Sequence, residues 1–422
     1  MRFNSPHRRK AWTSPLPWLR LLVLVAVLAA PLVHALPRVQ LQQTGFRPDQ
    51  VAILINEDDP LSRQIGEYYR QARQIPEGNL IRLRFPPGRA ALAKDEFLPL
   101  KAQIDRATPA HVQAYAVAWT MPYRVACMSL TSALALGFAE EYCSDKCGPT
   151  AASTYFNSTS RQPAADFKLR PAMMLAGADF NQVKALIDRG IAADSSFPEG
   201  RAYLLNTPDK ARSVRSAYFE QAAKEFAGVF PVDVLEAGSI EDRRDVLFYF
   251  TGLPFVPQLK TLGFLPGALA DHLTSFGGQL SGSSQMSSLR WLEAGATASY
   301  GTVVEPCNHP QKFPFPAVAM FYYFQGASAI EAYWKSLAWP GEGVFVGEPL
   351  AAPFAPLLRE TRPGQFELRV FSPREGRVRF AGSGTPIGPF KVLPQTLRLQ
   401  RGANLLRFKV PETGPAFVRL LW

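Results

Sequence analysis

Two patterns of apolar and polar residues follow one another along the chain. From residue 51 to residue 251, short apolar runs alternate with amphipathic stretches, which predicts buried strands joined by helices. The apolar runs occupy 51–56, 79–85, 114–120, 173–178, 202–206, 232–237 and 246–251, with helices expected at 60–73, 95–107, 181–194 and about 209–227. This order is typical of a mostly parallel sheet sandwiched between helices, with right-handed crossovers.

The rhythm is interrupted twice. Residues 121–171 hold three of the four cysteines and a polar stretch, and we expect an excursion stapled by disulfide. Residues 252–301 are rich in loops, with a short helix expected at 286–294 and a strand of small residues at 296–304. Further on, Ser328 and Glu331 form a capping box that predicts a helix ending near Ser336.

The second pattern begins at residue 365, where apolar and polar residues alternate with period two. Five such segments with Gly and Pro turns predict a small antiparallel β-sandwich or half-barrel, with most of its arginines facing water. A proline-rich linker at 353–356 precedes it. We therefore predict an α/β domain at 36–358 and an all-β domain at 359–422.

The first 35 residues have the features of a secretory signal. Arg8, Arg9 and Lys10 precede an apolar run at 21–33, and Val33-His34-Ala35 fits a cleavage site. The run is shorter than the roughly 20 residues that span a bilayer. We expect an exported protein, periplasmic or extracellular, whose mature chain has no transmembrane span. An uncleaved N-terminal anchor is the alternative.

The formal net charge of +11 is unevenly distributed. Residues 1–35 carry +5, residues 36–358 carry −2, and residues 359–422 carry +8. A basic tail of this kind can recognise an anionic envelope component such as lipid headgroups or phosphate-bearing polysaccharide. Nucleic acid is not expected, because the phenylalanines of the tail share the apolar phase of its strands and because the chain is exported.

The four cysteines are Cys127, Cys143, Cys147 and Cys307. An even number in an exported chain favours disulfides, although the C-x3-C spacing is also compatible with a metal site, and free thiols are the third option. We expect no metal and no cofactor, since neither a dinucleotide fingerprint, a Walker A sequence nor an H-E-x-x-H motif occurs.

Three groups of residues could carry chemistry. Asp271, His272 and Ser275 supply an orienting acid, a base and a hydroxyl nucleophile, but sequence neighbours on a helix would point in different directions. Glu305 and Cys307 follow the strand at 296–304, where α/β sheets place ligands. Arg124 follows the strand at 114–120 and could clamp an anion or form a structural ion pair.

A set of short segments resembles an uncharacterised family of exported bacterial proteins. They are Ile75-Pro76, Met121-Pro122-Tyr123-Arg124, Ile187-Asp188-Arg189-Gly190, Leu265-Pro266-Gly267-Ala268, 295–307 and Gly347-Glu348-Pro349-Leu350. More distantly, the order of parts resembles the gingipain-like cysteine peptidases of caspase fold, which also end in an immunoglobulin-like domain. That resemblance implies a caspase-like three-layer α/β domain.

The peptidase dyad of that branch is missing from its expected positions. Thr251-Gly252 stands where a His-Gly pair is expected, and no cysteine occurs between Cys147 and Cys307. The sequence therefore favours a peptidase-inactive binding or assembly factor of the envelope or extracellular space. The alternative is a hydrolase with a relocated site at His272, Ser275, Glu305 and Cys307. Arg124 and Asp271 are the candidate binding residues.

Overall fold

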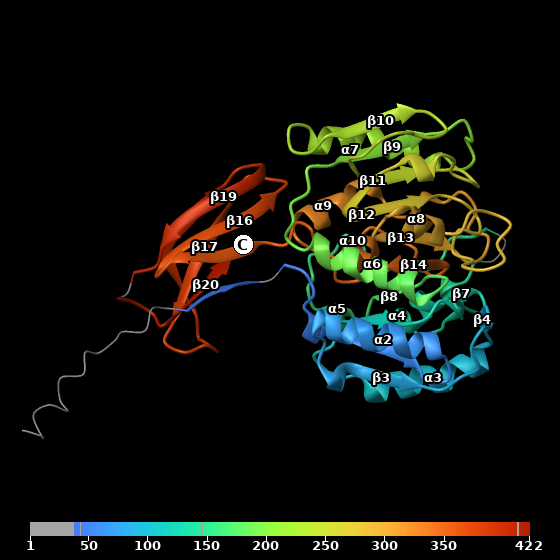
Figure 1. Ribbon diagram of the computed structural model, residues 1–422, viewed down its shortest axis with the longest axis horizontal. Coiled ribbons are helices and arrows are strands. Elements are labelled where there is room, and N and C mark those ends of the chain that lie inside the picture. The colour runs from blue at the N-terminus through green and yellow to red at the C-terminus, as the bar shows by residue number, and fades with distance from the viewer. Residues whose placement is uncertain (1–37, 43, 145–146, 412) are drawn as a thin grey trace, which may run out of the picture.

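The computed structural model describes residues 38–42, 44–144, 147–411 and 413–422. The predicted signal segment, residues 1–35, lies outside the described residues. The chain forms an α/β body and a smaller β unit beside it, shown in red at the left of Figure 1. No helix in the described part of the chain is long and apolar enough to cross a membrane.

A ten-stranded sheet forms the centre of the α/β body. One block of neighbouring strands, β10 to β13, is parallel, and a second block, β8 to β3, is also parallel. Strand β14 joins the blocks: it is antiparallel to β13 and meets β8 at the pair Val346 and Met174. Across the sheet the order is β10 (Val232–Glu236), β9 (Arg201–Asn206), β11 (Val246–Thr251), β12 (Phe264–His272), β13 (Ala298–Thr302), β14 (Gly343–Gly347), β8 (Ala172–Met174), β5 (Ala114–Val117), β2 (Val51–Asn56) and β3 (Leu80–Leu83).

Helices cover both faces of this sheet. Phe248 and Tyr249 are neighbours on β11 and so point to opposite faces. The Phe248 ring lies 5.7 Å from Phe324 of α9, whereas the Tyr249 ring lies 5.0 Å from Trp291 of α8. The helices are α2 (Pro60–Arg73), α3 (Lys94–Ala107), α4 (Leu130–Leu136), α5 (Pro163–Phe167), α6 (Phe180–Ala193), α7 (Phe219–Phe226), α8 (Leu289–Ala294), α9 (Pro316–Phe324) and α10 (Ala329–Lys335).

The predicted excursion separates β5 from β8, as expected. It contains α4, α5 and two strands of a small sheet made of β4 (Ala91–Leu92), β6 (Arg124–Val125) and β7 (Met128–Ser129). The predicted capping box is also present: the Glu331 carboxylate accepts hydrogen bonds from the Ser328 amide and hydroxyl at the start of α10. Glu331 also accepts one from the Phe46 amide, so it ties the segment before β2 to this helix.

The β unit contains two packed sheets. One has the order β1-β20-β17-β18 and the other the order β15-β16-β19. Inward residues such as Leu368, Val378 and Leu420 are fully buried between them. The strands are β1 (Arg38–Leu41), β15 (Leu357–Arg362), β16 (Gln365–Ser372), β17 (Gly376–Ser383), β18 (Lys391–Leu399), β19 (Gly402–Lys409) and β20 (Phe417–Leu421).

Strand β1 differs from the sequence-based domain boundary. Residues 38–41 were expected in the α/β domain, yet they pair in parallel with β20 in the β unit. Val39 and Leu41 pack against the core of that unit, which accounts for the pairing. The two units also pack on each other, because the Phe371 ring of β16 lies 4.8 Å from Phe324 and 5.0 Å from Phe354.

Candidate functional site

His272 is a buried structural residue at the end of β12. The Trp291 indole donates a hydrogen bond to Nδ1 at 2.9 Å, so the ring proton resides on Nε2, which donates to the Met286 carbonyl at 3.0 Å. Burial lowers the pKa of His272 to about 3. Both ring nitrogens are engaged, and neither is directed at a nucleophile.

Asp271 lies on the opposite face of β12 and does not orient His272. The two residues belong to a strand, in a region that was expected to be rich in loops, and successive side chains of a strand point to opposite faces. Asp271 is fully buried, and its Oδ1 lies 2.7 Å from Nη1 of Arg215 in an ion pair that is close without being an aligned hydrogen bond. Burial raises the pKa of Asp271 to about 6, and the Arg215 charge opposes that rise. Asp271 therefore has a buried structural partner and no access to a ligand.

Ser275 and Glu305 are not brought together with His272. The Ser275 carbonyl accepts a hydrogen bond from the Thr302 hydroxyl, whereas the Glu305 side chain accepts one from the Cys307 amide. Glu305 is exposed and Ser275 is half-buried. Among the described residues no hydrogen bond joins these side chains, so they form no acid–base–nucleophile relay.

All four cysteines are paired, which confirms the disulfide expectation. Cys127 is bonded to Cys143, and Cys147 is bonded to Cys307. Cys307 therefore has no free thiol, and the thiol form of the hydrolase alternative is not open to this chain. Through its second disulfide, the excursion is tied to the loop that follows β13.

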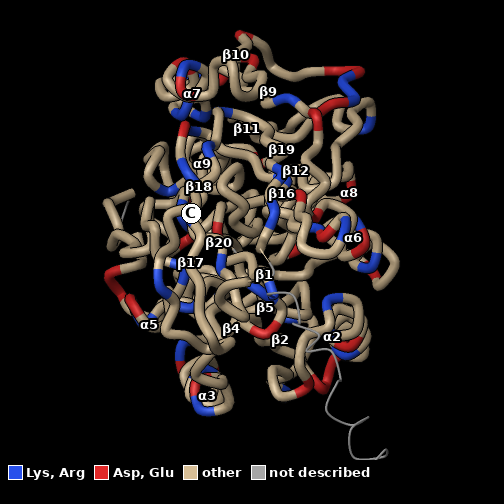
Figure 2. The backbone as a smooth tube through the Cα atoms, turned by 90° about the vertical axis from the view of Figure 1, so that its left-hand side faces the viewer, with Lys and Arg blue, Asp and Glu red and all other residues tan. Residues whose placement is uncertain are grey.

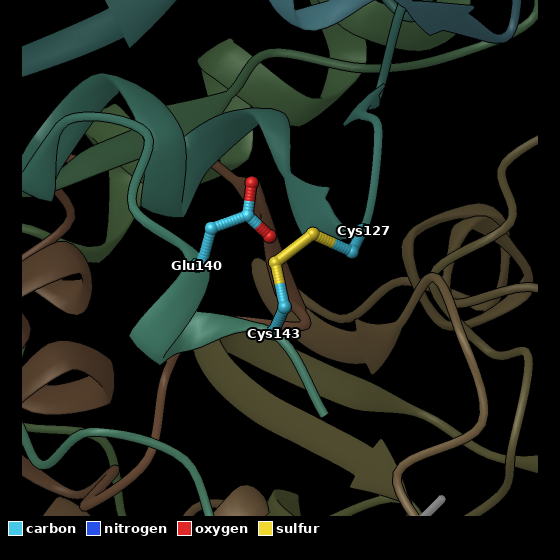
Figure 3. A group of neighbouring side chains, drawn as sticks. All are labelled: Cys127, Glu140 and Cys143. Atoms are coloured by element: carbon cyan, nitrogen blue, oxygen red, sulfur yellow. A yellow bond between two sulfur atoms is a disulfide. The ribbon is translucent and has the colours of Figure 1, made fainter. Parts of the chain in front are cut away.

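One group of side chains has the spacing of metal ligands, but its two cysteines are bonded to each other and so supply no thiolate. The ligand atoms of Cys127, Glu140 and Cys143 lie within 4.8 Å of one another. Figure 3 shows that the two sulfur atoms are joined in the disulfide, with the Glu140 carboxylate beside them. A metal ion would need deprotonated thiols, so the group does not fit a metal site in this state.

Arg124 lies on β6, in the small sheet beyond the end of β5. It is half-buried, and its Nε is buried without a hydrogen-bond partner. No ion pair to Arg124 occurs within the described residues, so the structural ion pair considered from sequence is not seen. Sequence placed this residue correctly near a strand end, but no cavity that we describe is lined by it.

The outer surface of the sheet β1-β20-β17-β18 carries a cluster of arginines. Val378, Leu399, Val418 and Leu420 point into the core, so the residues that alternate with them point outward. The outward side chains include Arg38, Arg377, Arg379, Arg398 and Arg419, which we call the arginine face. No acidic residue occupies an outward position on these four described strands.

The register of this sheet places like charges directly opposite each other. Arg377 of β17 is paired with Arg398 of β18, and both are exposed. The acid that neutralises Arg398 is Glu375, at 3.8 Å, with 80% and 68% of the two side chains exposed. Such an exposed pair is weak. Figure 2 shows the Lys and Arg positions along these strands.

The arginine face continues into a cavity between the two units. This seam cavity has a volume of about 580 Å³, within the usual range for ligand sites. Three arginines line it, Arg47 and Arg161 from the α/β body and Arg419 from β20. Four glutamines complete its polar lining: Gln40, Gln42, Gln50 and Gln162.

The charges of the seam cavity have partners of unequal strength. Arg47 forms a salt bridge of 2.8 Å with Asp49, and this hydrogen-bonded contact lowers the pKa of Asp49. Arg419 contacts the Gln40 side chain at 3.5 Å and stacks on the Phe390 ring at 4.0 Å from its centroid. No acidic side chain is among the described residues that line the cavity. The lining therefore suits an anion.

Sequence reasoning identified the basic tail but not this site. The period-two pattern put the arginines on the polar phase, which is the signal that could have located the arginine face. The residues before β2 and before α5 gave no such signal, because their approach to β20 depends on how the two units pack.

No family model matches the chain, and no curated protein matches it. A solved structure named "Structure of Protease" aligns with 87% of this chain and 98% of its own chain, at 10% identity and a TM-score of 0.44. A similarity at this level has no bearing on activity.

Proposed function

We propose that the protein is an exported binding protein, without cysteine-peptidase activity, that recognises an anionic component of the cell envelope through the arginine face. The observation that carries the proposal is the direct opposition of Arg377 and Arg398 on a surface whose outward strand positions hold no acid. Like charges placed opposite each other destabilise a sheet. An anion bound between them converts that repulsion into attraction, and guanidinium groups suit phosphate and carboxylate geometry.

The seam cavity extends this surface with groups of a second kind. Its glutamine amides can donate to and accept from hydroxyl or ester oxygens, whereas Arg419 supplies charge. Cavity and arginine face share Arg419. An extended anionic ligand could therefore lie along the face and place one end in the cavity.

In this proposal the α/β body is a scaffold of caspase-like three-layer type. A large sheet covered on both faces and one antiparallel strand beside β13 support that assignment. Thr251, at the end of β11, and the disulfide-bonded Cys307 support the absence of peptidase chemistry. Export is supported by the two disulfides, which persist mainly in oxidising compartments.

Binding to inorganic polyphosphate tests the anion-binding role. We expect the full chain to bind it, with affinity falling as salt is raised. The double variant Arg377→Gln/Arg398→Gln should bind about 25-fold more weakly, because each cation near an anionic surface contributes about 1 kcal/mol. Isothermal titration calorimetry provides the measurement. The thermal midpoint of the free variant should not fall, since a repulsive pair has been removed.

The matched control changes the same charge on the other sheet. Arg359 and Arg362 are exposed on β15, and Arg359→Gln/Arg362→Gln should leave polyphosphate affinity within about twofold. Equal losses of polyphosphate affinity in the two double variants would mean that binding depends on net charge alone and not on the arginine face, which would overturn the proposal. Peptidase activity of the wild type that is lost in Cys307→Ala would overturn the proposed absence of cysteine-peptidase activity.

A further inference from the structure

The turn between β17 and β18 exposes large apolar side chains. Ile387, at the tip of the turn, is 91% exposed, and Val392, at the start of β18, is 58% exposed. Pro386 and Pro389 beside them are exposed as well. Exposed large apolar side chains close together in the chain can mark an interaction surface.

Hydrogen bonds within the turn close this tip. The Thr385 hydroxyl donates a hydrogen bond to the Gly388 carbonyl at 2.6 Å, and the Thr385 amide donates to the Ser383 hydroxyl at 3.1 Å. A partner that buries Ile387 therefore does not have to order the turn first, which removes part of the entropic cost of binding.

The tip is continuous with the arginine face. The Phe390 ring lies over the guanidinium of Arg419. Val392 and Arg419 are both paired with Ala381, so their side chains point to the same, outer side of the sheet. Lys391, between Phe390 and Val392, is exposed. Apolar and cationic side chains therefore meet at one end of the β17–β18 hairpin.

From this juxtaposition we infer that the tip docks into an anionic lipid bilayer, with Ile387 and Val392 entering the acyl region while the arginine face contacts the headgroups. The inference rests on the proposed function and names its partner. A soluble polyanion would engage the arginines but would leave Ile387 and Val392 in water. A bilayer with anionic lipids offers both an acyl region and negative charge, which is the combination used by peripheral membrane-binding segments.

Vesicle co-sedimentation of the mature chain, without the predicted signal segment 1–35, tests the inference. We expect binding to phosphatidylcholine vesicles that contain phosphatidylglycerol and much weaker binding to phosphatidylcholine alone. Ile387→Ser should lower the partition coefficient about tenfold or more, because the transfer of one isoleucine side chain out of water is lost. The same variant should bind polyphosphate as the wild type does. Leu405→Ser is the matched control: Leu405 is 55% exposed on β19, in the other sheet of the unit, and vesicle binding should be unchanged.

A second variant reports insertion directly. Ile387→Trp should bind the vesicles, and its fluorescence should be quenched by brominated acyl chains more strongly than that of the wild type, which already contains seven tryptophans. Vesicle binding by Ile387→Ser equal to the wild type, or no extra quenching in Ile387→Trp, would overturn bilayer docking. If polyphosphate binding persists in that case, the proposed function stands without the membrane. If Arg377→Gln/Arg398→Gln instead binds both polyphosphate and the vesicles as strongly as the wild type, the proposed function itself is overturned.

Discussion

At the residue scale, the end of β12 shows how polar side chains are buried without forming a catalytic site. Asp271 and His272 are adjacent, yet one contacts Arg215 and the other contacts Trp291 and Met286. The sequence indicated them as candidates for chemistry, because an acid beside a histidine has the composition of a relay, but the structure gives both side chains buried structural partners. Those partners could not be identified from the sequence, since Arg215 and Trp291 reach them only through tertiary packing.

The burial of His272 predicts acid sensitivity. Its folded pKa of about 3 lies below the ordinary value of 6.5, so the unfolded chain binds the proton first. The contribution of this residue to stability is therefore complete above about pH 6.5 and decreases as the pH falls toward 3. Between pH 7 and pH 4.5 it amounts to roughly 2–3 kcal/mol of the free energy of unfolding.

The non-titrating variant His272→Gln isolates this effect in urea denaturation at the two pH values. The wild type should lose more stability than the variant over this interval by that amount. Asp271 titrates in the opposite sense, because its raised pKa adds stability as the pH falls through about 6, but it is present in both proteins. Equal losses in the two proteins would contradict a buried, neutral His272.

At the element scale, strands with uniform apolar composition were predicted well and strands with polar interruptions were not. β2 and β11 were predicted with their observed bounds, because VAILIN and VLFYFT are nearly continuous apolar runs. β12 lies in the region that was expected to be loops. This strand was not recognised because Pro266 and Gly267 lie near its start and two ionisable residues lie at its end. Those ionisable residues are buried because they have partners on other elements.

Gly190 of α6 makes a testable contact between elements. A Cβ at this position would lie 2.4 Å from Oε2 of Glu348, the residue that follows β14. Glu348 is held there by the Tyr69 hydroxyl at 2.6 Å and by Arg73. Alanine is normally favoured over glycine inside a helix by about 1 kcal/mol. Here we expect Gly190→Ala to destabilise by about 1–3 kcal/mol through overpacking, measured by chemical denaturation.

Gly78 provides the comparison for that substitution. No heavy atom lies within 4 Å of a Cβ built at Gly78, so Gly78→Ala should change the free energy of unfolding by less than about 0.5 kcal/mol. A stabilising Gly190→Ala would mean that Glu348 can move away from α6 at little cost.

At the scale of the whole molecule, the charge distribution was predictable and the chain path was not. The +8 of residues 359–422 was evident from composition, and their period-two alternation predicted a β unit. The participation of β1 was not evident, because a four-residue strand gives too short a pattern to locate its partner. The seam cavity depends on that path, since Gln40 and Gln42 reach it only because β1 pairs with β20.

The pairing of β1 can be tested by replacing its inward apolar side chains with charged ones. Val39→Asp/Leu41→Asp should detach the strand and expose the edge of β20. Amide hydrogen exchange in β20 should then accelerate at least about tenfold, while β11 and β12 in the α/β body remain protected. Gln40→Ser, on the outward side of the same strand, should leave exchange in β20 near its wild-type rate.

The same pairing has a consequence for biogenesis. β20 follows every other described element in the chain, whereas β1 precedes them all. During vectorial synthesis, residues 38–41 must therefore remain without a partner until the final strand emerges, while the α/β body between them folds from contacts nearer in sequence. Assembly of the β unit is then the last step, and a chain interrupted before residue 417 would present the apolar side of β1 to chaperones and proteases as an unfinished product.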